Sequence, residues 1–356
     1  MDNFEEYLRE NSQKVNQELE TYLKKKSSNR YIESLLGRSN YEYDPEAMTK
    51  SILEPAWYLL DLGGKRWRPA LTMLTLEALG KNPDEYIEFS IIPEVIHNAT
   101  LIHDDIEDNS PKRRNADSIH VKFGIDVATN LGDFMYFFPM LALIDSPKLT
   151  QDQKNRAASI YIKNMTRVSL GQAIDIAWHV ALVDPKTITE EKYLQMAHDK
   201  TGVLSRFACE LGSALAGADD KTVDIMGRFG ATIGIAFQIQ DDILNLTESK
   251  LSEGKGGVGD DISEGKITLM VLHVMKEGNE EDKNRLSEIL RMHTKDKALI
   301  KEAIGIIDKY GSKEYSTKIA EQMIKEAWDA VDKTLPNSAA KERMKQLVDF
   351  LVHRNV

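Results

Sequence analysis

The sequence predicts an all-α fold, arranged as one large bundle of helices. Three observations support this fold class. Apolar side chains recur with a helical period along nearly the whole chain, no segment shows the apolar–polar alternation of a half-buried strand, and no Pro-, Ser- or Gly-rich linker divides the chain. The simplest arrangement is a single domain over residues 1–356, although a division near residue 250 would also fit the pattern.

The expected helices follow one another through short connectors. Gly63 and Gly64 form a usual signal for a helix C-terminus, and Pro69 lies in the first turn of the helix that follows. A Gly-rich loop at 253–261 interrupts the helical pattern, and residues 1–40 comprise an N-terminal helix and, over 27–40, a polar loop. The expected helices span residues 3–26, 45–62, 69–80, 91–108, 124–145, 151–182, 190–217, 221–247, 263–276, 280–293, 295–310, 312–335 and 339–353.

Composition limits the class of protein. The formal charge is 46 − 57 = −11, which argues against general nucleic-acid binding because that requires a basic face. Cys209 is the only cysteine, so an internal disulfide framework is excluded and a reducing compartment is expected. The acidic N-terminus does not resemble a signal peptide, and no run of 18 apolar residues exists, so we expect a cytoplasmic protein without a transmembrane segment.

The first candidate site is the stretch Leu101–Asp108, LIHDDIED, which places four carboxylates within five residues at the end of an apolar helix. Asp104 and Asp108 are four residues apart, so they lie about 40° apart on one helix face, where unpaired like charges are destabilising. Carboxylate oxygens suit Mg²⁺, which usually also binds substrate phosphate. A solvated acidic helix end would show the same pattern.

A second acidic site repeats this arrangement. The apolar helix Gly230–Leu246 ends in Asp241–Asp242, and Gln238, Asp241 and Asn245 share one stripe of the helix. Asn245 can offer a carbonyl oxygen but no charge. Ligand and metal sites of helix bundles are built from side chains on facing helices. The two acidic helices could likewise face each other across a central cavity of the bundle. Surface charge is the alternative interpretation.

Basic groups accompany both acidic sites and could bind anionic substrates. GGKRWRP, residues 63–69, gathers three basic side chains at a helix start, where free N–H groups favour phosphate. Lys200-Thr201-Gly202 lies within a helix, where Gly costs about 1 kcal/mol and suggests a local kink. Singly, each basic residue could be a solvated surface charge. The basic residues are Lys65, Arg66, Arg68, Arg113, Arg114, Lys200, Lys255 and Lys266.

Together these motifs resemble the trans-isoprenyl (polyprenyl) diphosphate synthases. The resemblance covers Gly63 to Thr268 and includes GGKRxRP, DDIED with the downstream RR, KTG, FQxxDD, and GK followed by DDI and GK. HDDIEDNS and the DDxxN of the second site are most similar to geranylgeranyl diphosphate synthases of the eukaryotic type. The resemblance implies an isoprenoid synthase-like helical bundle around a central cavity.

The resemblance also implies a role for each matching position. Asp104 and Asp108 would ligate Mg²⁺ on the allylic diphosphate, with Asp105 in support. Asp241 would ligate a further Mg²⁺, with Asp242 nearby, and three ions are expected in all. Lys200, Lys255 and Arg113 would contact the allylic diphosphate, and Lys266 would close over it. The isopentenyl diphosphate site would comprise Lys65, Arg68, His97 and Arg114, and the residues lining the reacting centre would be Thr201 and Gln238.

Three positions remain open at this point. The family's RRG reads RRN here, so the loop geometry after Arg114 is undetermined. The loop after Lys255 is about one residue longer than in the family, so either Asp260 or Asp261 could fill the family's acidic position. His97 lies seven residues before Asp104, about 20° away around the helix, so it points toward the same cavity unless it is a structural histidine.

The implied reaction is the ionisation of an allylic diphosphate and attack of isopentenyl diphosphate on the resulting carbocation. Ala99 and Thr100 lie about one turn below Asp104, where bulky aromatic residues stop growth at fifteen carbons in the family. These small side chains favour a twenty-carbon product, geranylgeranyl diphosphate, with farnesyl diphosphate or a product of 25 or more carbons as alternatives.

Two rival functions share part of this pattern. A class I terpene cyclase has an α-bundle and an aspartate-rich motif, but its second motif would read NDxxSxxxE and it would not need GGKRWRP. A non-catalytic subunit of a heteromeric synthase would be expected to lose an aspartate-rich motif, and both motifs are present here. Family likeness implies a homodimer, and a larger assembly would also be compatible.

Overall fold

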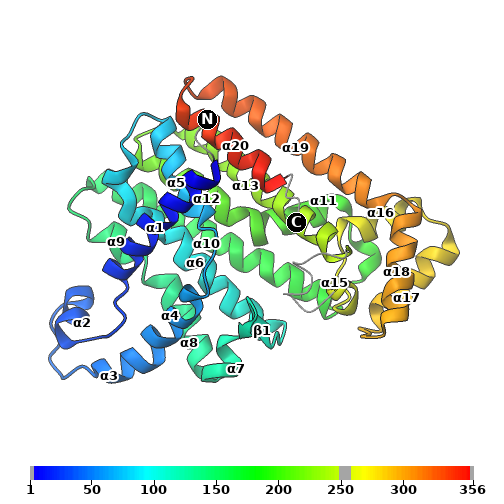
Figure 1. The fold of residues 1–356 in the computed structure, drawn as a ribbon, viewed down its shortest axis with the longest axis horizontal. Coiled ribbons are helices and arrows are strands. Elements are labelled where there is room, and N and C mark those ends of the chain that lie inside the picture. The colour runs from blue at the N-terminus through cyan, green and yellow to red at the C-terminus, as the bar shows by residue number, and fades with distance from the viewer. Residues whose placement is uncertain (1–3, 248–257, 353–356) are drawn as a thin grey trace. The chain divides into compact units, whose positions relative to one another are not determined.

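The computed structural model describes residues 4–247 and 258–352, and these divide between two compact units. Unit 1 comprises Met1–Ile160 and Leu211–Asp219, and unit 2 comprises Tyr161–Glu210 and Asp220–Val356. The predicted all-α fold class is confirmed, because the sole strands among the described residues are two that are two residues long (Figure 1). The assignment of the chain to a single domain remains a prediction.

Unit 1 is built around one long helix, α6. This helix packs against α1, α5 and α8, and its buried face carries large aliphatic side chains such as Ile92 and Ile96. The elements of unit 1 are α1 Phe4–Tyr22, α2 Asn29–Leu36, α3 Pro45–Met48, the π-turn η1 Thr49–Leu53, α4 Glu54–Asp61, α5 Trp67–Ala78, η2 Pro83–Tyr86, α6 Ile87–Glu107, β1 Lys112–Arg113, β2 Ala116–Asp117, α7 Ile119–Phe123, α8 Ile125–Phe137, α9 Met140–Ile144 and the start of α10 Gln151–His179.

Unit 2 is built around α13, which packs against the π-turn η4, α19 and α20. Figure 1 shows α19 and α20, in orange and red, running beside α13. After the remainder of α10, the elements are η3 Pro185–Thr187, α11 Glu190–Ala197, η4 His198–Gly202, α12 Val203–Leu215 (which ends in unit 1), α13 Asp220–Asn245, α15 Asp260–Ser263, α16 Leu269–Glu277, α17 Glu280–Arg291, α18 Lys297–Lys309, α19 Ser312–Thr334 and α20 Ala339–Val352.

Several local predictions were wrong. The helix expected at 124–145 is divided into α8 and α9, and the helix expected at 263–276 begins only at Leu269, the first residue of α16. Residues 27–40 are not a continuous polar loop, because they contain α2: Ser28 caps its N-terminus by accepting a hydrogen bond from the N–H of Tyr31, and Ile32 is buried. The short hairpin formed by β1 and β2 was not expected either. Strands of two residues are too short to show an alternating pattern.

One stretch of the described residues, Ile125–Ile144, is long and apolar enough to cross a membrane by length and composition alone. The stretch is not one continuous helix, because α8 ends at Phe137 and α9 begins at Met140, after Pro139. Both helices pack against α6 within unit 1, and core helices of ordinary globular proteins satisfy the same criterion. The stretch therefore does not contradict the expectation of no transmembrane segment.

Candidate active site

Two neighbouring aspartates at the end of α6 differ in how deeply they are buried. Asp105 is buried and accepts hydrogen bonds from Nε of Arg113 at 2.9 Å and from its Nη2. Burial raises the pKa of Asp105, and the Arg113 guanidinium offsets part of that rise. Asp104 is half-buried, with Oδ2 lying 3.6 Å from Nη2 of Arg113, and Asp108 is half-buried as the C-cap of the helix. Asp104 and Asp108, unlike Asp105, are thus carboxylates that solvent can reach.

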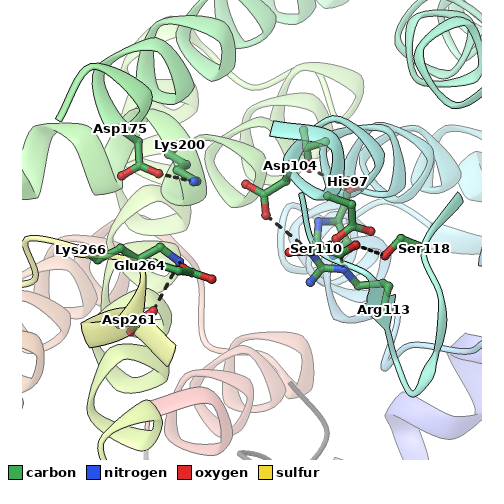
Figure 2. Close-up of polar contacts among 12 residues, drawn as sticks. His97, Asp104, Ser110, Arg113, Ser118, Asp175, Lys200, Asp261, Glu264 and Lys266 are labelled. Carbon is green, nitrogen blue, oxygen red and sulfur yellow. Dashed lines mark hydrogen bonds and ion pairs between the residues drawn. The ribbon is translucent and has the colours of Figure 1, made fainter. Parts of the chain in front are cut away.

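The hairpin after α6 explains the RRN sequence. Arg113 pairs with Ala116, so the turn consists of Arg114 and Asn115, with φ of 54° and 64°. Two successive residues with positive φ define a type I′ turn, and Asn tolerates this conformation better than most residues other than Gly. The hydroxyl of Ser118 also donates to the carbonyl of Ser110 at 2.6 Å and closes the base of the hairpin (Figure 2). RRN is therefore compatible with a tight turn.

The GGKRWRP loop lies beside this hairpin in unit 1. Arg114 donates from Nη1 to the carbonyl of Gly63. Arg66 is buried and pairs with Glu94, with Nη1 and Oε1 2.6 Å apart, so it stabilises the loop instead of facing solvent. Lys65 is exposed, whereas Arg68 is buried with its guanidinium 4.4 Å from the centroid of the Trp67 ring.

His97 lies among these cations. Its pKa is well below the usual value because burial disfavours the charged imidazole and because the guanidinium groups of Arg68, Arg114, Arg113 and Arg66 repel it. His97 is therefore neutral at pH 7 and can both donate and accept a hydrogen bond. Its location in a cluster of positive charge matches an anion site better than an isolated structural histidine.

In unit 2, the suspected kink at Lys200-Thr201-Gly202 is the π-turn η4. A Cβ on Gly202 would lie 2.7 Å from the carbonyl oxygen of Ala231, and one on Gly234 would lie 2.6 Å from Cα of Gly202. A Cβ on Gly171, in α10, would lie 2.3 Å from the backbone N of Lys200. These glycines allow α10 and α13 to approach the π-turn closely from both sides.

This close approach orders a chain of hydrogen bonds from Thr201 to Tyr193. The Thr201 hydroxyl donates to Oε1 of Gln238 at 2.8 Å, and Nε2 of Gln238 donates to Oδ1 of Asp242 at 2.7 Å. The Tyr193 hydroxyl donates to Oδ2 of Asp242 at 2.7 Å. Burial and the nearby Asp261 raise the pKa of Asp242 to about 7. Asp241 is half-buried, so it is the more accessible of the pair.

The segment after α13 distinguishes Asp261 from Asp260. Asn245 accepts at Oδ1 from the N–H of Asp261 at 3.1 Å, and Asp261 is one cause of the raised pKa of Asp242. Nζ of Lys266 lies 3.4 Å from Oδ1 of Asp261 and 2.5 Å from Oε2 of Glu264 (Figure 2). Burial and the nearby Glu264 raise the pKa of Asp260 to about 6. Asp261 is thus the residue beside the second acidic site.

The positions of the remaining predicted residues follow from the same elements. Nζ of Lys200 donates to Asp175 (Figure 2). Ala99 is fully buried in α6, whereas Thr100 is half-buried and its hydroxyl donates to the carbonyl of His97 at 2.8 Å. Lys255 lies outside the described residues.

The oxygen donors fit a hard divalent cation that binds together with a substrate. Over residues 4–247 and 258–352 no group of three or more His, Cys, Asp or Glu side chains forms a metal cage. Mg²⁺ seldom uses such a cage, because it usually takes one or two carboxylates together with water and substrate phosphate. Pairs of half-buried carboxylates, as at Asp104 and Asp108, therefore match this ion better than they match zinc.

Three residues of the site were missed from the sequence. Asp175 pairs with Lys200, Tyr193 bonds Asp242, and Glu94 holds Arg66. Glu94 could have been suspected, because an acidic residue in the middle of an apolar helix requires a partner when it is buried. Asp175 and Tyr193 carry no such signal, because their partners are 25 and 49 residues away in the sequence.

Comparison with known proteins places these features in one family. The family described as polyprenyl synthetase matches residues 49–307. A short chain isoprenyl diphosphate synthase of Methanothermobacter thermautotrophicus is 32% identical over 305 residues, which are 86% of this chain and 91% of that protein. A geranylgeranyl pyrophosphate synthase of Geoglobus acetivorans is 32% identical over 336 residues, 92% of this chain and 96% of that protein. The crystal structure of geranylgeranyl pyrophosphate synthetase from Pyrococcus horikoshii is similar with a TM-score of 0.83 and 30% identity, covering 99% of this chain and 98% of that one.

Proposed function

The chain belongs to the polyprenyl synthetase family, and we propose that it is a Mg²⁺-dependent prenyltransferase that condenses isopentenyl diphosphate with an allylic diphosphate to make geranylgeranyl diphosphate. One observation carries this proposal. Unit 1 contains accessible carboxylates at the end of α6 and, separately, a basic cluster around the 63–68 loop. The carboxylates suit a diphosphate that is bound through metal, and the basic cluster suits a diphosphate that is bound by cationic side chains alone. Unit 1 therefore offers binding groups for two substrates.

We assign the allylic diphosphate to the carboxylates through bound metal. Asp104, Asp108 and Asp241 would hold the ions, which we expect to be three Mg²⁺. Bound Mg²⁺ would stabilise the negative charge that develops on the departing diphosphate. Arg113 and Lys200 would contact the diphosphate directly, and we assign the same role to Lys255 from its motif. Lys266 would close over the diphosphate. Asp261 would fill the family's acidic position.

The basic cluster of unit 1 would hold isopentenyl diphosphate. Lys65, Arg68 and Arg114 supply positive charge, and neutral His97 can donate to a phosphate oxygen. Thr201 and Gln238, whose side chains are hydrogen-bonded to each other, would line the reacting centre. No side chain is assigned to the final loss of a proton, for which the released diphosphate is the proposed acceptor. Apolar walls would exclude water from the cation.

The proposed product length is inferred from two small side chains in α6. Ala99 and Thr100 are small, and neither would block a lengthening chain beneath Asp104 as an aromatic side chain would. The names of the Geoglobus acetivorans and Pyrococcus horikoshii proteins support the same product. A fifteen-carbon product would require a larger side chain here.

We also propose that the enzyme works in the cytoplasm as a homodimer. Unit 1 exposes several large apolar side chains along α8 and α9, among them Phe137 with 74% and Ile125 with 59% of its surface accessible. A second copy of the chain is the proposed partner, and exposed α8 residues would lie in the dimer interface.

The test separates the synthase from a terpene cyclase. The purified chain is incubated with Mg²⁺ and an allylic diphosphate, with and without isopentenyl diphosphate, and diphosphate release is measured. A synthase consumes the allylic substrate rapidly and elongates it when isopentenyl diphosphate is present. Rapid conversion of the allylic substrate alone to a cyclic hydrocarbon would contradict the proposal, and a chain inactive in both mixtures would contradict it equally.

A further inference from the structure

We propose that the N-terminal helix α1 is part of the isopentenyl diphosphate site, where Asn16 and Ser12 fix the loop that carries Lys65 and Arg68. Asn16 is then a positioning residue, since it would not touch the substrate. The match to the family begins at residue 49, so α1 lies outside it. This inference rests on the proposed function, because it concerns the second of the two proposed substrates.

The loop needs support because its backbone is strained. Arg66 has φ of 47° and ψ of 33°, the left-handed conformation, directly before α5. That conformation is unfavourable for a residue with a Cβ, and it persists where the surroundings hold it. Arg66 lies between Lys65 and Arg68, so any relaxation of its backbone would move the proposed substrate-binding side chains.

Three acceptors from different elements hold the Arg66 guanidinium. Its Nη1 donates to Oε1 of Glu94 in α6 at 2.6 Å, and its Nη2 donates to the carbonyl of Leu60 at 2.9 Å. Its Nε donates to Oδ1 of Asn16 in α1 at 3.1 Å. Asn98 supports Glu94 in turn, with Nδ2 donating to Oε1 at 3.0 Å. The guanidinium is thus fixed by both α1 and α6.

A second contact from α1 reaches the backbone of the same loop. The Ser12 hydroxyl donates to the carbonyl of Lys65 at 3.3 Å. Ser12 and Asn16 are four residues apart, so they lie on one face of the helix. Both contacts act on consecutive residues of the loop, and Ser12 acts on a residue proposed to bind substrate.

The core of unit 1 holds α1 firmly enough to position the loop. Val15 and Leu19 have no exposed surface, and α1 packs against both α5 and α6. The loop is also tied from its other side, because Arg114 donates to the carbonyl of Gly63. A helix that is fixed in the core and bonded to the loop can set the position of Lys65 without touching the substrate.

The test compares Asn16→Ala with Gln17→Ala in the full-length enzyme. Both variants remove an exposed amide side chain from α1, and Asn16 is the one whose Oδ1 accepts the hydrogen bond from Arg66. Steady-state kinetics give kcat and a separate KM for each substrate, and calorimetry measures binding of isopentenyl diphosphate alone. We expect Asn16→Ala to raise the KM and Kd for isopentenyl diphosphate about three- to tenfold, because a hydrogen bond to a charged group is lost. Ser12→Ala should shift both constants less, in the same direction.

The other constants distinguish positioning from a general loss of structure. The KM for the allylic diphosphate, kcat and the sedimentation of the protein should stay unchanged in Asn16→Ala. The inference is overturned if isopentenyl diphosphate binds Asn16→Ala as it binds the unmodified chain, if Gln17→Ala has the same effect, or if both KM values rise together. Failure of the proposed function looks different, because the unmodified chain would then elongate no allylic substrate.

Discussion

At the scale of single residues, burial assigns different tasks to side chains that are identical in sequence. Asp104 and Asp105 are neighbours, yet Asp105 is buried and bonded twice by Arg113, whereas Asp104 remains half-buried. Asp241 and Asp242 repeat this division, because Asp242 is buried and bonded by Tyr193 and Gln238. In each pair one aspartate is buried and held by hydrogen bonds, and its less buried neighbour is the proposed metal ligand.

Asp104→Ala should therefore abolish most of the activity without unfolding the protein. We expect turnover to fall about a hundredfold or more, because a proposed ligand of the charge-stabilising Mg²⁺ is lost. The melting temperature should change by only about 2 °C, since a half-buried carboxylate is removed. Glu107→Ala, which removes an exposed carboxylate from the same helix, is the control. Near-normal turnover of Asp104→Ala would refute its assignment as a metal ligand.

The raised pKa of Asp242 predicts a pH dependence of stability in the metal-free protein. Burial and Asp261 raise this pKa from 3.8 to about 7, so between these values the folded protein holds a proton that the unfolded chain has released. The free energy of unfolding therefore falls as pH rises through this window. Asp242→Asn should lose this contribution, so that the variant gains stability relative to the unmodified protein as pH rises.

Urea denaturation in EDTA at intervals from pH 5 to 8 measures this difference. The curves of unfolding free energy against pH should converge or cross for the unmodified protein and Asp242→Asn. Asp117→Asn, which removes an exposed carboxylate in unit 1, is the control variant. A parallel curve for Asp242→Asn would show that Asp242 does not titrate in this window.

At the scale of elements, glycines shape the second acidic site by letting helices approach the π-turn. Gly202 and Gly234 face each other across η4 and α13, and Gly171 touches the other side of the same turn. This packing brings the Thr201 hydroxyl within hydrogen-bonding distance of Gln238. The residues proposed to line the reacting centre are therefore positioned by the glycines next to them.

Gly202→Ala should separate these elements. Its Cβ would lie 2.7 Å from the carbonyl oxygen of Ala231, and overpacking of this kind costs about 1–3 kcal/mol of folding free energy. Gly305→Ala is the matched control, because Gly305 is also helical and nothing lies within 4 Å of its added Cβ. The free energy of unfolding of the control should rise by up to about 1 kcal/mol, because Ala has a higher helix propensity than Gly. Equal melting temperatures for the two variants would contradict the packing argument.

The sequence predicted most helices and could not predict their partners. Periodicity located the two acidic helices, and Gly202 marked the π-turn, because both signals are local. The helix α2 was missed because its short apolar pattern lies among polar residues. The pairs Lys200–Asp175 and Tyr193–Asp242 depend on how helices pack, which no local pattern encodes. Likewise, nothing in GGKRWRP alone shows that Arg66 is buried against Glu94.

At the scale of the whole molecule, the proposed product depends on α6. This helix would carry a proposed metal ligand, Asp104, and, about one turn earlier, a residue that helps to limit the length of the product, Ala99. Ala99→Phe should shorten the main product, since an aromatic ring would then stand about one turn beneath Asp104. Ala99 is fully buried, so melting temperature must be measured beside product length. Unchanged product length from a folded Ala99→Phe protein would show that other residues set the limit.

The central claim is that this chain elongates an allylic diphosphate to twenty carbons. The most direct measurement incubates the purified protein with Mg²⁺, isopentenyl diphosphate and, in turn, dimethylallyl, geranyl or farnesyl diphosphate, and determines product length by chromatography. The expected result is geranylgeranyl diphosphate as the longest main product from at least one primer. An end product of fifteen carbons, or of 25 or more, would contradict the assigned length, and the absence of elongation from every primer would contradict the function itself.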